Sequence, residues 1–152
     1  MTDFELEHAY DTVNVLRAGG VAKIELNRPD SINAWNKPFG IDLLAAIERV
    51  AGDDDVRCVL IAGAGRGFSS GADLKDGFDP DEAGRPDVYA ALTERYHPII
   101  RGVRLMPKPV VAAVHGPAVG IGLSLALASD LARRFSPAGR SVTHTARPTA
   151  RR

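Results

Sequence analysis

The sequence has very little cysteine and no long apolar run. Cys58 is the only cysteine among 152 residues, which excludes an intrachain disulfide and a cysteine-based metal site. No apolar stretch approaches the ~20 residues that a membrane-spanning helix requires. The first ten residues, MTDFELEHAY, are acidic and lack the basic and apolar regions of a secretory signal. We therefore expect a cytoplasmic protein with no metal site and no membrane contact.

Acidic residues are absent from the last part of the chain. All 19 Asp and Glu residues lie within residues 1–130, which have a formal charge of −6, whereas residues 131–152 carry six arginines and a charge of +6. The latter segment has little apolar periodicity, and such a composition is typical of disorder. We predict a folded core over residues 1–130 and a basic, disordered tail over residues 131–152.

Two hypotheses account for this tail. The first is a shifted or prematurely ended reading frame in a GC-rich gene, because wrong-frame translation produces such a composition. The second is a basic tail that contacts nucleic acid or anionic lipid. The six arginines are spread over 22 residues, and Phe135 is the only Phe, Tyr or Trp among them, which argues against the second hypothesis. We expect no nucleic-acid partner.

The remaining sequence alternates between strand and helix patterns. Alternation of apolar and polar residues predicts strands over 12–18 and 21–26, joined by a hairpin turn at Gly19-Gly20. Apolar residues at three- and four-residue spacing begin at Phe39 and form the stripe of an amphipathic helix. Further strands are predicted over 56–63, which we expect to be covered on both faces, and 108–116, and helices over 88–105 and 122–130. Helices that alternate with buried strands indicate an α/β fold.

Two of these strands end in loops of small residues, at 63–72 and 116–122. Glycine and alanine allow a ligand to approach the backbone closely. The second loop opens directly into a predicted helix, and a helix after Ala72 would give the first loop the same form. Backbone N–H groups at a helix N-terminus have no intrahelical partner and favour negative charge. Two such groups converging from different loops would form an oxyanion hole.

Three stretches carry a resemblance to a known family. IELNRPDSINA (24–34), RGFSSGADLK (66–75) and PKPVVAAVHGPAVGIGLSLALASD (107–130) resemble the enoyl-CoA hydratase/isomerase family, or crotonase family, and the resemblance covers residues 10–130. It implies an α/β fold of the ClpP/crotonase type, a spiral of ββα units of which this chain holds the N-terminal portion. It also implies binding of fatty acyl-CoA thioesters, with no cofactor beyond the coenzyme A moiety of the substrate.

The resemblance also implies individual site residues. It places the two oxyanion donors on the backbone N–H groups of Ala72 and Ile121. At the second position many members have glycine, and the branched side chain here is expected to narrow the pocket. The positions implied to contact coenzyme A and substrate are Arg28, Ser31, Ile32, Ala34, Ser70, Ala72, Asp73, Leu74 and Gly120. From the residues alone, Asp73 could instead cap a following helix, and Arg28 could be an ordinary solvated charge.

The sequence departs from the family at the catalytic acids. Hydratases of this family use two glutamates to deliver and remove the protons of water. The first position is Ser124 here, and the region of the second contains no acid. A hydroxyl group cannot act as a carboxylate base near neutral pH. The alternatives are an active hydratase or isomerase, a non-hydratase member (isomerase, hydrolase or decarboxylase), and a non-catalytic protein that binds acyl-CoA.

The family pattern also continues beyond Asp130 with a region that closes the site and builds trimers. Residues 131–152 do not follow that pattern. We therefore interpret the chain as C-terminally truncated, and the resemblance leaves its homo-oligomeric state open.

Overall fold

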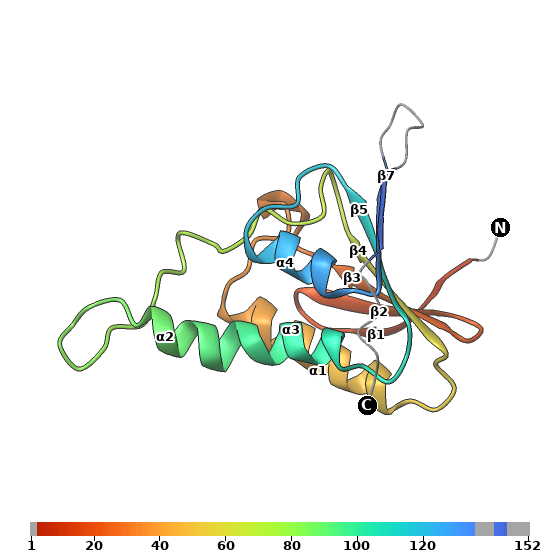
Figure 1. The fold of residues 1–152 in the computed structure, drawn as a ribbon, viewed down its shortest axis with the longest axis horizontal. Coiled ribbons are helices and arrows are strands. Elements are labelled where there is room, and N and C mark those ends of the chain that lie inside the picture. The colour runs from red at the N-terminus through yellow and green to blue at the C-terminus, as the bar shows by residue number, and fades with distance from the viewer. Residues whose placement is uncertain (1–2, 136–141, 146–152) are drawn as a thin grey trace.

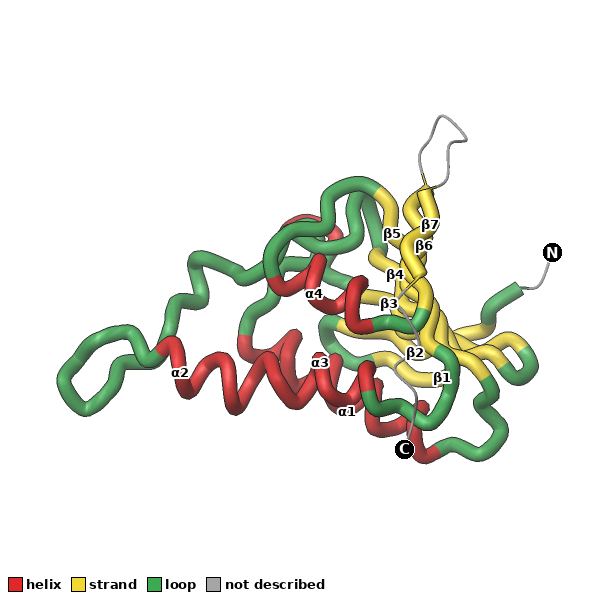
Figure 2. The backbone as a smooth tube through the Cα atoms, in the orientation of Figure 1, coloured by secondary structure: helices red, strands yellow, loops and turns green. Residues whose placement is uncertain are grey.

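A computed structural model describes residues 3–135 and 142–145 of the chain. Seven strands form one mixed sheet in which they are ordered as they occur in the sequence. The strands are β1 (Glu5–Ala9), β2 (Val13–Ala18), β3 (Val21–Leu26), β4 (Cys58–Gly63), β5 (Val110–His115), β6 (Leu131–Phe135) and β7 (Val142–Thr145). Figures 1 and 2 show the helices gathered on one side of this sheet.

The helical segments are α1 (Lys37–Gly52), α2 (Val88–Ala90), η2 (Ala91–Tyr96), α3 (His97–Arg104) and α4 (Ile121–Ala128), with a short 3-10 turn, η1, at Pro29–Ser31. No helix among the described residues is both long and apolar enough to cross a membrane. The predicted hairpin is confirmed: β2 and β3 are antiparallel, Ala18 pairs with Val21, and Gly19 has a φ of 54°. Strand β1, which the sequence did not predict, pairs with β2.

Helix α1 confirms the predicted stripe but begins earlier than expected. The side chain of Asn36 caps the helix by accepting a hydrogen bond from the backbone N–H of Phe39. Pro38 lies in the first turn, where a helix tolerates proline because the missing N–H would have no partner. The buried positions follow the three- and four-residue spacing of that stripe and are Phe39, Leu43, Ala46, Ile47 and Val50.

Residues 88–104 form one helical path with an irregular middle. Segment η2 is a π-helix, and the backbone N–H of His97 reaches the carbonyl of Leu92. Pro98 follows directly and has no N–H to donate, so regular α-helical bonding is interrupted within the helix predicted over 88–105.

Strands β3, β4, β5 and β6 are parallel. Leu26 pairs with Gly63, Ala62 pairs with Ala113, and His115 pairs with Phe135. The carboxyl ends of these strands therefore lie at one edge of the sheet. The loops that follow β3, β4 and β5 all leave from this edge, which is where open parallel sheets bind ligands.

Two predictions about the sheet were wrong. Strand β4 was expected to be covered on both faces, but its buried residues alternate with partly exposed ones, because the described helices cover one face. Residues 131–135 and 142–145, predicted to belong to a disordered tail, instead form β6 and β7. The backbone of β6 pairs with the open edge of β5, and that of β7 pairs with β6, which satisfies hydrogen-bonding groups that would otherwise be exposed. Residues 136–141 and 146–152 of the predicted tail lie outside the described residues.

Candidate functional site

The loop after β3 lies directly against the loop after β4. The backbone N–H of Ser70 donates to the carbonyl of Ile32 at 2.8 Å, and that of Trp35 donates to the carbonyl of Gly71 at 2.8 Å. The N–H of Asp73 returns to the carbonyl of Trp35 at 2.9 Å. These bonds form a short parallel bridge between Trp35 and Ala72. The structure thus brings together two of the three motifs that the sequence analysis singled out.

Asn33 joins these two loops through a buried side chain. Its φ is 53° and its exposed fraction is 0%. Its Oδ1 accepts the backbone N–H of Arg28 at 2.8 Å. Its Nδ2 lies 3.0 Å from the carbonyl oxygens of Ala64 and Gly67 and 3.1 Å from that of Phe68. Asparagine suits this position because it tolerates the left-handed backbone conformation and its amide can both donate and accept hydrogen bonds.

The loop after β4 is joined in turn to the loop after β5. The N–H of Phe68 donates to the carbonyl of His115 at 2.8 Å, and the N–H of Ser69 donates to the carbonyl of Pro117 at 3.0 Å. The N–H of Val119 donates to the carbonyl of Ser69 at 2.9 Å. All three loops therefore form one hydrogen-bonded layer at the carboxyl edge of the sheet.

The two small-residue loops meet at a pair of glycines. A Cβ placed on Gly71, which has a φ of 91°, would lie 2.9 Å from the carbonyl oxygen of Val119 and 3.8 Å from the Cα of Gly120. A Cβ on Gly120 would lie 4.0 Å from the Cα of Gly71. The next residues along the two loops are Ala72 and Ile121, the predicted donors. The first loop needs glycine because a Cβ on Gly71 would collide with the carbonyl of Val119, and the second needs it because Gly120 has a φ of 53° and a ψ of −125°, which side chains disfavour.

The backbone N–H groups of these two donors have no hydrogen-bond partner among residues 3–135 and 142–145. Ala72 is exposed, and Ile121 is half-buried with its side chain packed against the core. Ile121 is the first residue of α4, so its N–H lies at the positive end of a helix. Two unpaired donors next to one close contact between loops are chemically suited to bind an anionic or strongly polarised oxygen.

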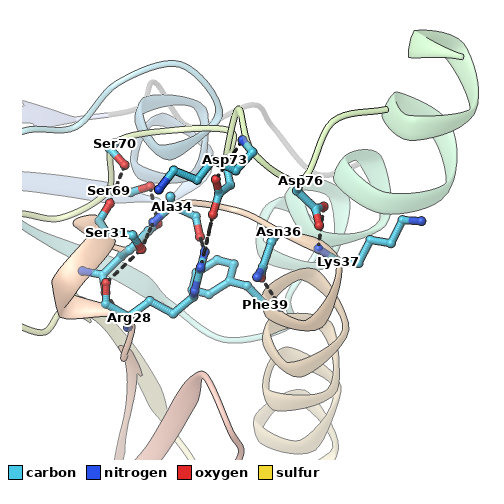
Figure 3. A network of polar contacts seen from close by, with 12 residues as sticks. Arg28, Ser31, Ala34, Asn36, Lys37, Phe39, Ser69, Ser70, Asp73 and Asp76 are labelled. Atoms are coloured by element: carbon cyan, nitrogen blue, oxygen red, sulfur yellow. Dashed lines mark hydrogen bonds and ion pairs between the residues drawn. The ribbon is translucent and has the colours of Figure 1, made fainter. Parts of the chain in front are cut away.

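The segment that follows Ala72, the first predicted donor, differs from expectation. The sequence is compatible with a helix after Ala72, but residues 74–76 form a turn and the next helix begins at Val88. Asp73 therefore caps no helix. Its Oδ1 accepts the backbone N–H of Lys75 at 3.1 Å, and its Oδ2 binds Arg28 (Figure 3).

The structure places the other predicted contact residues around this bridge. The guanidinium of Arg28 binds Asp73 and also donates to the carbonyl of Ala34. Ser70 donates its hydroxyl hydrogen bond to the carbonyl of Ser31 at 2.8 Å, as Figure 3 shows. Leu74 projects into solvent and is 94% exposed. Their contact with coenzyme A stays a prediction.

Two hollows lie near the site. One of 390 Å³ runs along α4 and is lined by Val119, Leu123 and Leu127 among others. The other, of 330 Å³, lies between α1 and η2 and includes Ile41 and Leu44. Neither of these two hollows is lined by Ala72 or Ile121.

Side chains that could act as bases or nucleophiles are mostly engaged elsewhere. Ser124 is exposed, and its Oγ donates to the carbonyl of Gly120 at 3.3 Å. The Nε2 of His115 lies 2.9 Å from the carbonyl oxygen of Gly65. Burial raises the pKa of the half-buried Cys58 thiol, which disfavours its reactive thiolate form. The described residues contain no cluster of side chains that could hold a metal ion.

A charged cluster ties the segment after the first donor to two helices. The Oδ2 of Asp76 accepts the backbone N–H of Lys37 at 3.0 Å, and Asp79 accepts hydrogen bonds from the side chains of Lys37 and Arg95. These two hydrogen bonds hold the pKa of Asp79 below its ordinary value. The cluster anchors the polar segment of residues 76–87 to α1 and η2.

The residues that connect the loops were not predicted from the sequence. Neither Asn33 nor Ser69 was assigned a role in joining the loops, yet both are fully buried. One signal was present for Asn33: an asparagine within a turn is a common occupant of the left-handed region. The sequence carried no comparable signal for the contacts of Ser69 with Asn33, Pro117 and Val119, because these partners are distant along the chain.

The chain is similar to known proteins over most of its described length. The family model described as enoyl-CoA hydratase/isomerase matches residues 17–134. The 1,2-epoxyphenylacetyl-CoA isomerase of Escherichia coli is 39% identical over 112 residues, which are 74% of this chain and 43% of the relative. A probable enoyl-CoA hydratase of Rhodobacter capsulatus is 38% identical over 123 residues, 81% of this chain and 46% of the relative.

Two further similarities agree with these. The mitochondrial Delta(3,5)-Delta(2,4)-dienoyl-CoA isomerase of Mus musculus is 35% identical over 133 residues, 82% of this chain and 41% of the relative. The crystal structure of an enoyl-CoA hydratase/carnithine racemase from Magnetospirillum magneticum matches with a TM-score of 0.74 at 35% identity. The matched region is 83% of this chain and 47% of the solved chain. The chain spans about half the length of these proteins. The family match ends at residue 134, beyond the predicted limit at residue 130.

Proposed function

Because the chain belongs to the enoyl-CoA hydratase/isomerase family and has the crotonase fold, we propose that it binds an acyl-CoA thioester. In this proposal the thioester carbonyl oxygen lies between the backbone N–H groups of Ala72 and Ile121. Removal of a proton next to the thioester transfers negative charge to this oxygen. The two N–H groups stabilise that charge, and one donor of this kind is typically worth ~10²–10³ in rate. The proposal requires no cofactor beyond the coenzyme A moiety of the substrate.

The observation that supports the proposal is the contact between Gly71 and Gly120. It places two loops, 49 positions apart along the chain, so close that a Cβ on the first glycine would lie 3.8 Å from the Cα of the second. Each glycine directly precedes a residue whose backbone N–H has no partner in the described part of the chain. An unpaired N–H group is expected to find a water or ligand acceptor.

Among reactions of this family, we propose isomerisation in preference to hydration. Hydration needs a group that activates a water and a group that protonates carbon, whereas isomerisation needs only one group that takes a proton from one carbon of the substrate and returns it to another. Ser124 stands at the first glutamate position, and its hydroxyl hydrogen bonds to the carbonyl of Gly120. Asp73, the acid nearest in sequence to the first donor, is paired with Arg28. Two of the relatives named above are isomerases of CoA thioesters. The second candidate is a protein that binds acyl-CoA without turnover, because Ser124 offers no carboxylate.

Thermal unfolding with and without an acyl-CoA tests the binding. Trp35 is buried between Phe39 and Tyr96, so its fluorescence reports unfolding of the core. A ligand present at ~100 times its Kd that binds only the folded state adds about 2.7 kcal/mol to the free energy of unfolding. The melting temperature should rise with acyl-CoA and not with a free adenine nucleotide. The proposal is wrong if acyl-CoA leaves the melting temperature unchanged.

Ultraviolet absorbance of the conjugated enoyl thioester then separates the reactions. Isomerisation of a 3-enoyl-CoA to the 2-enoyl form creates conjugation and raises this absorbance. Hydration of crotonyl-CoA removes conjugation and lowers it. A melting shift with neither absorbance change would identify the non-catalytic acyl-CoA binder.

A further inference from the structure

Ser69 is buried between the two loops that carry the proposed donors. Its exposed fraction is 0%. Its Oγ donates a hydrogen bond to the carbonyl of Asn33 at 2.9 Å and accepts the backbone N–H of Gly71 at 3.2 Å. The hydroxyl proton and a lone pair are therefore both in use, which leaves Ser69 unsuited to act as a nucleophile. The bond to Gly71 fixes the residue that immediately precedes the first donor.

The same residue also contacts the second loop. Its backbone N–H and carbonyl bind Pro117 and Val119, respectively. A Cβ placed on Gly122 would lie 2.5 Å from both the Cβ and the Oγ of Ser69. The first turn of α4 thus packs directly on this hydroxyl group. Gly122 immediately follows Ile121, so Ser69 contacts a sequence neighbour of each donor.

We propose that Ser69 is a positioning residue that sets the placement of the N–H groups of Ala72 and Ile121 relative to each other. The inference rests on the proposed oxyanion function for its chemical meaning, but the geometry that it concerns exists in the protein without ligand. Loss of the hydroxyl group leaves the buried N–H of Gly71 without its acceptor and opens space beside Gly122. Both donors are then free to move, and a displacement of about 1 Å can cost ~10²-fold in rate.

The first test uses the protein without ligand. In Ser69→Ala, the amide ¹H and ¹⁵N resonances of both Ala72 and Ile121 should move. Ser129→Ala is the matched control, since Ser129 is also buried, at 2% exposure, and its Oγ also donates to one backbone carbonyl, that of Leu125, at 3.3 Å. The control should leave both donor resonances in place. The proposal is overturned if Ser69→Ala leaves either donor resonance unchanged, or if the control moves both.

The second test uses a bound conjugated thioester, cinnamoyl-CoA, whose ultraviolet band moves to longer wavelength when its carbonyl oxygen is polarised. At saturation, Ser69→Ala should show a smaller red shift than the unaltered protein, with a Kd within about threefold, and Ser129→Ala should show the full shift. Where turnover is measurable, kcat should fall ~10–100-fold with little change in KM. A full red shift in Ser69→Ala would overturn the proposal.

The two tests separate this inference from the proposed function. If the unaltered protein binds no thioester, the proposed function fails, and the amide resonances alone decide the role of Ser69. If Ser69→Ala does not fold, Ser69→Cys supplies the measurement, since a thiol is a weaker donor and acceptor than a hydroxyl group. Both donor resonances should move in that variant as well, and unmoved resonances would overturn the proposal.

Discussion

Arg28 and Asp73 are 45 residues apart in the sequence, yet the Nη2 atom of Arg28 lies 3.1 Å from the Oδ2 atom of Asp73. Only 22% of the arginine side chain and 16% of the aspartate side chain are exposed. Arg28 also donates to the carbonyl of Ala34, which precedes the bridge between Trp35 and Ala72. The pair therefore fastens the loop of the first proposed donor to the turn after β3.

Asp73→Asn should weaken this attachment. The amide removes the charge that binds the guanidinium, and hydrogen bonds to charged groups typically contribute about 1.5–3 kcal/mol. We expect the free energy of unfolding to fall by about 1–2 kcal/mol, measured by urea denaturation with Trp35 fluorescence. Arg66→Ala is the control, because the side chain of Arg66 has no ion pair among the described residues. Equal losses in the two variants would contradict the prediction.

Asn33→Ala should lower the free energy of unfolding more than a surface substitution does. It removes the donors to three carbonyl oxygens and the acceptor for Arg28 N–H, and each unsatisfied buried group costs about 1–3 kcal/mol. We expect a loss of about 3 kcal/mol or more in the free energy of unfolding. Asn33→Gly should lower the free energy of unfolding by less, because glycine adopts a φ of 53° without strain. If alanine is tolerated as well as glycine, the left-handed backbone conformation is not maintained.

Gly71→Ala should force the two small-residue loops apart. The new Cβ would lie 2.9 Å from the carbonyl oxygen of Val119, and the φ of 91° is unfavourable for alanine. Gly77→Ala separates these effects, since Gly77 has a φ of 65° but a Cβ placed there would meet no atom within 4 Å. We expect about 1 kcal/mol of destabilisation in the control, from backbone strain alone, and a larger loss in Gly71→Ala. Only Gly71→Ala should also weaken acyl-CoA binding, as measured by isothermal titration calorimetry.

The attachment of residues 76–87 should depend on pH through Asp79. Hydrogen bonds from Lys37 and Arg95 lower the pKa of this carboxyl group, so the unfolded chain binds its proton more readily than the folded chain. The stabilisation is therefore complete above the ordinary pKa of about 3.9 and is lost as the pH falls through the lowered folded value. The carboxyl ¹³C shift of Asp79 should titrate below about pH 3.9. Lys37→Gln should move this midpoint upward, and an unchanged midpoint would contradict the assigned cause.

Local patterns were sufficient to predict much of the fold. The Gly19-Gly20 turn and the alternation on either side predicted the β2–β3 hairpin, because both signals come from adjacent residues. The stripe from Phe39 predicted the buried face of α1 for the same reason. The two small-residue loops were also visible in the sequence, since glycine is the residue that permits close approach of two backbones.

The tertiary structure decided how those loops meet. Whether Gly71 lies against Gly120 depends on the parallel order of β3, β4 and β5, which brings the loops after them to one edge. The roles of Asn33 and Ser69 depend on partners tens of residues away, and no local pattern records such partners. The pairing of β6 with β5 likewise overrode a composition typical of disorder, because an open strand edge offers hydrogen bonds that composition alone does not show.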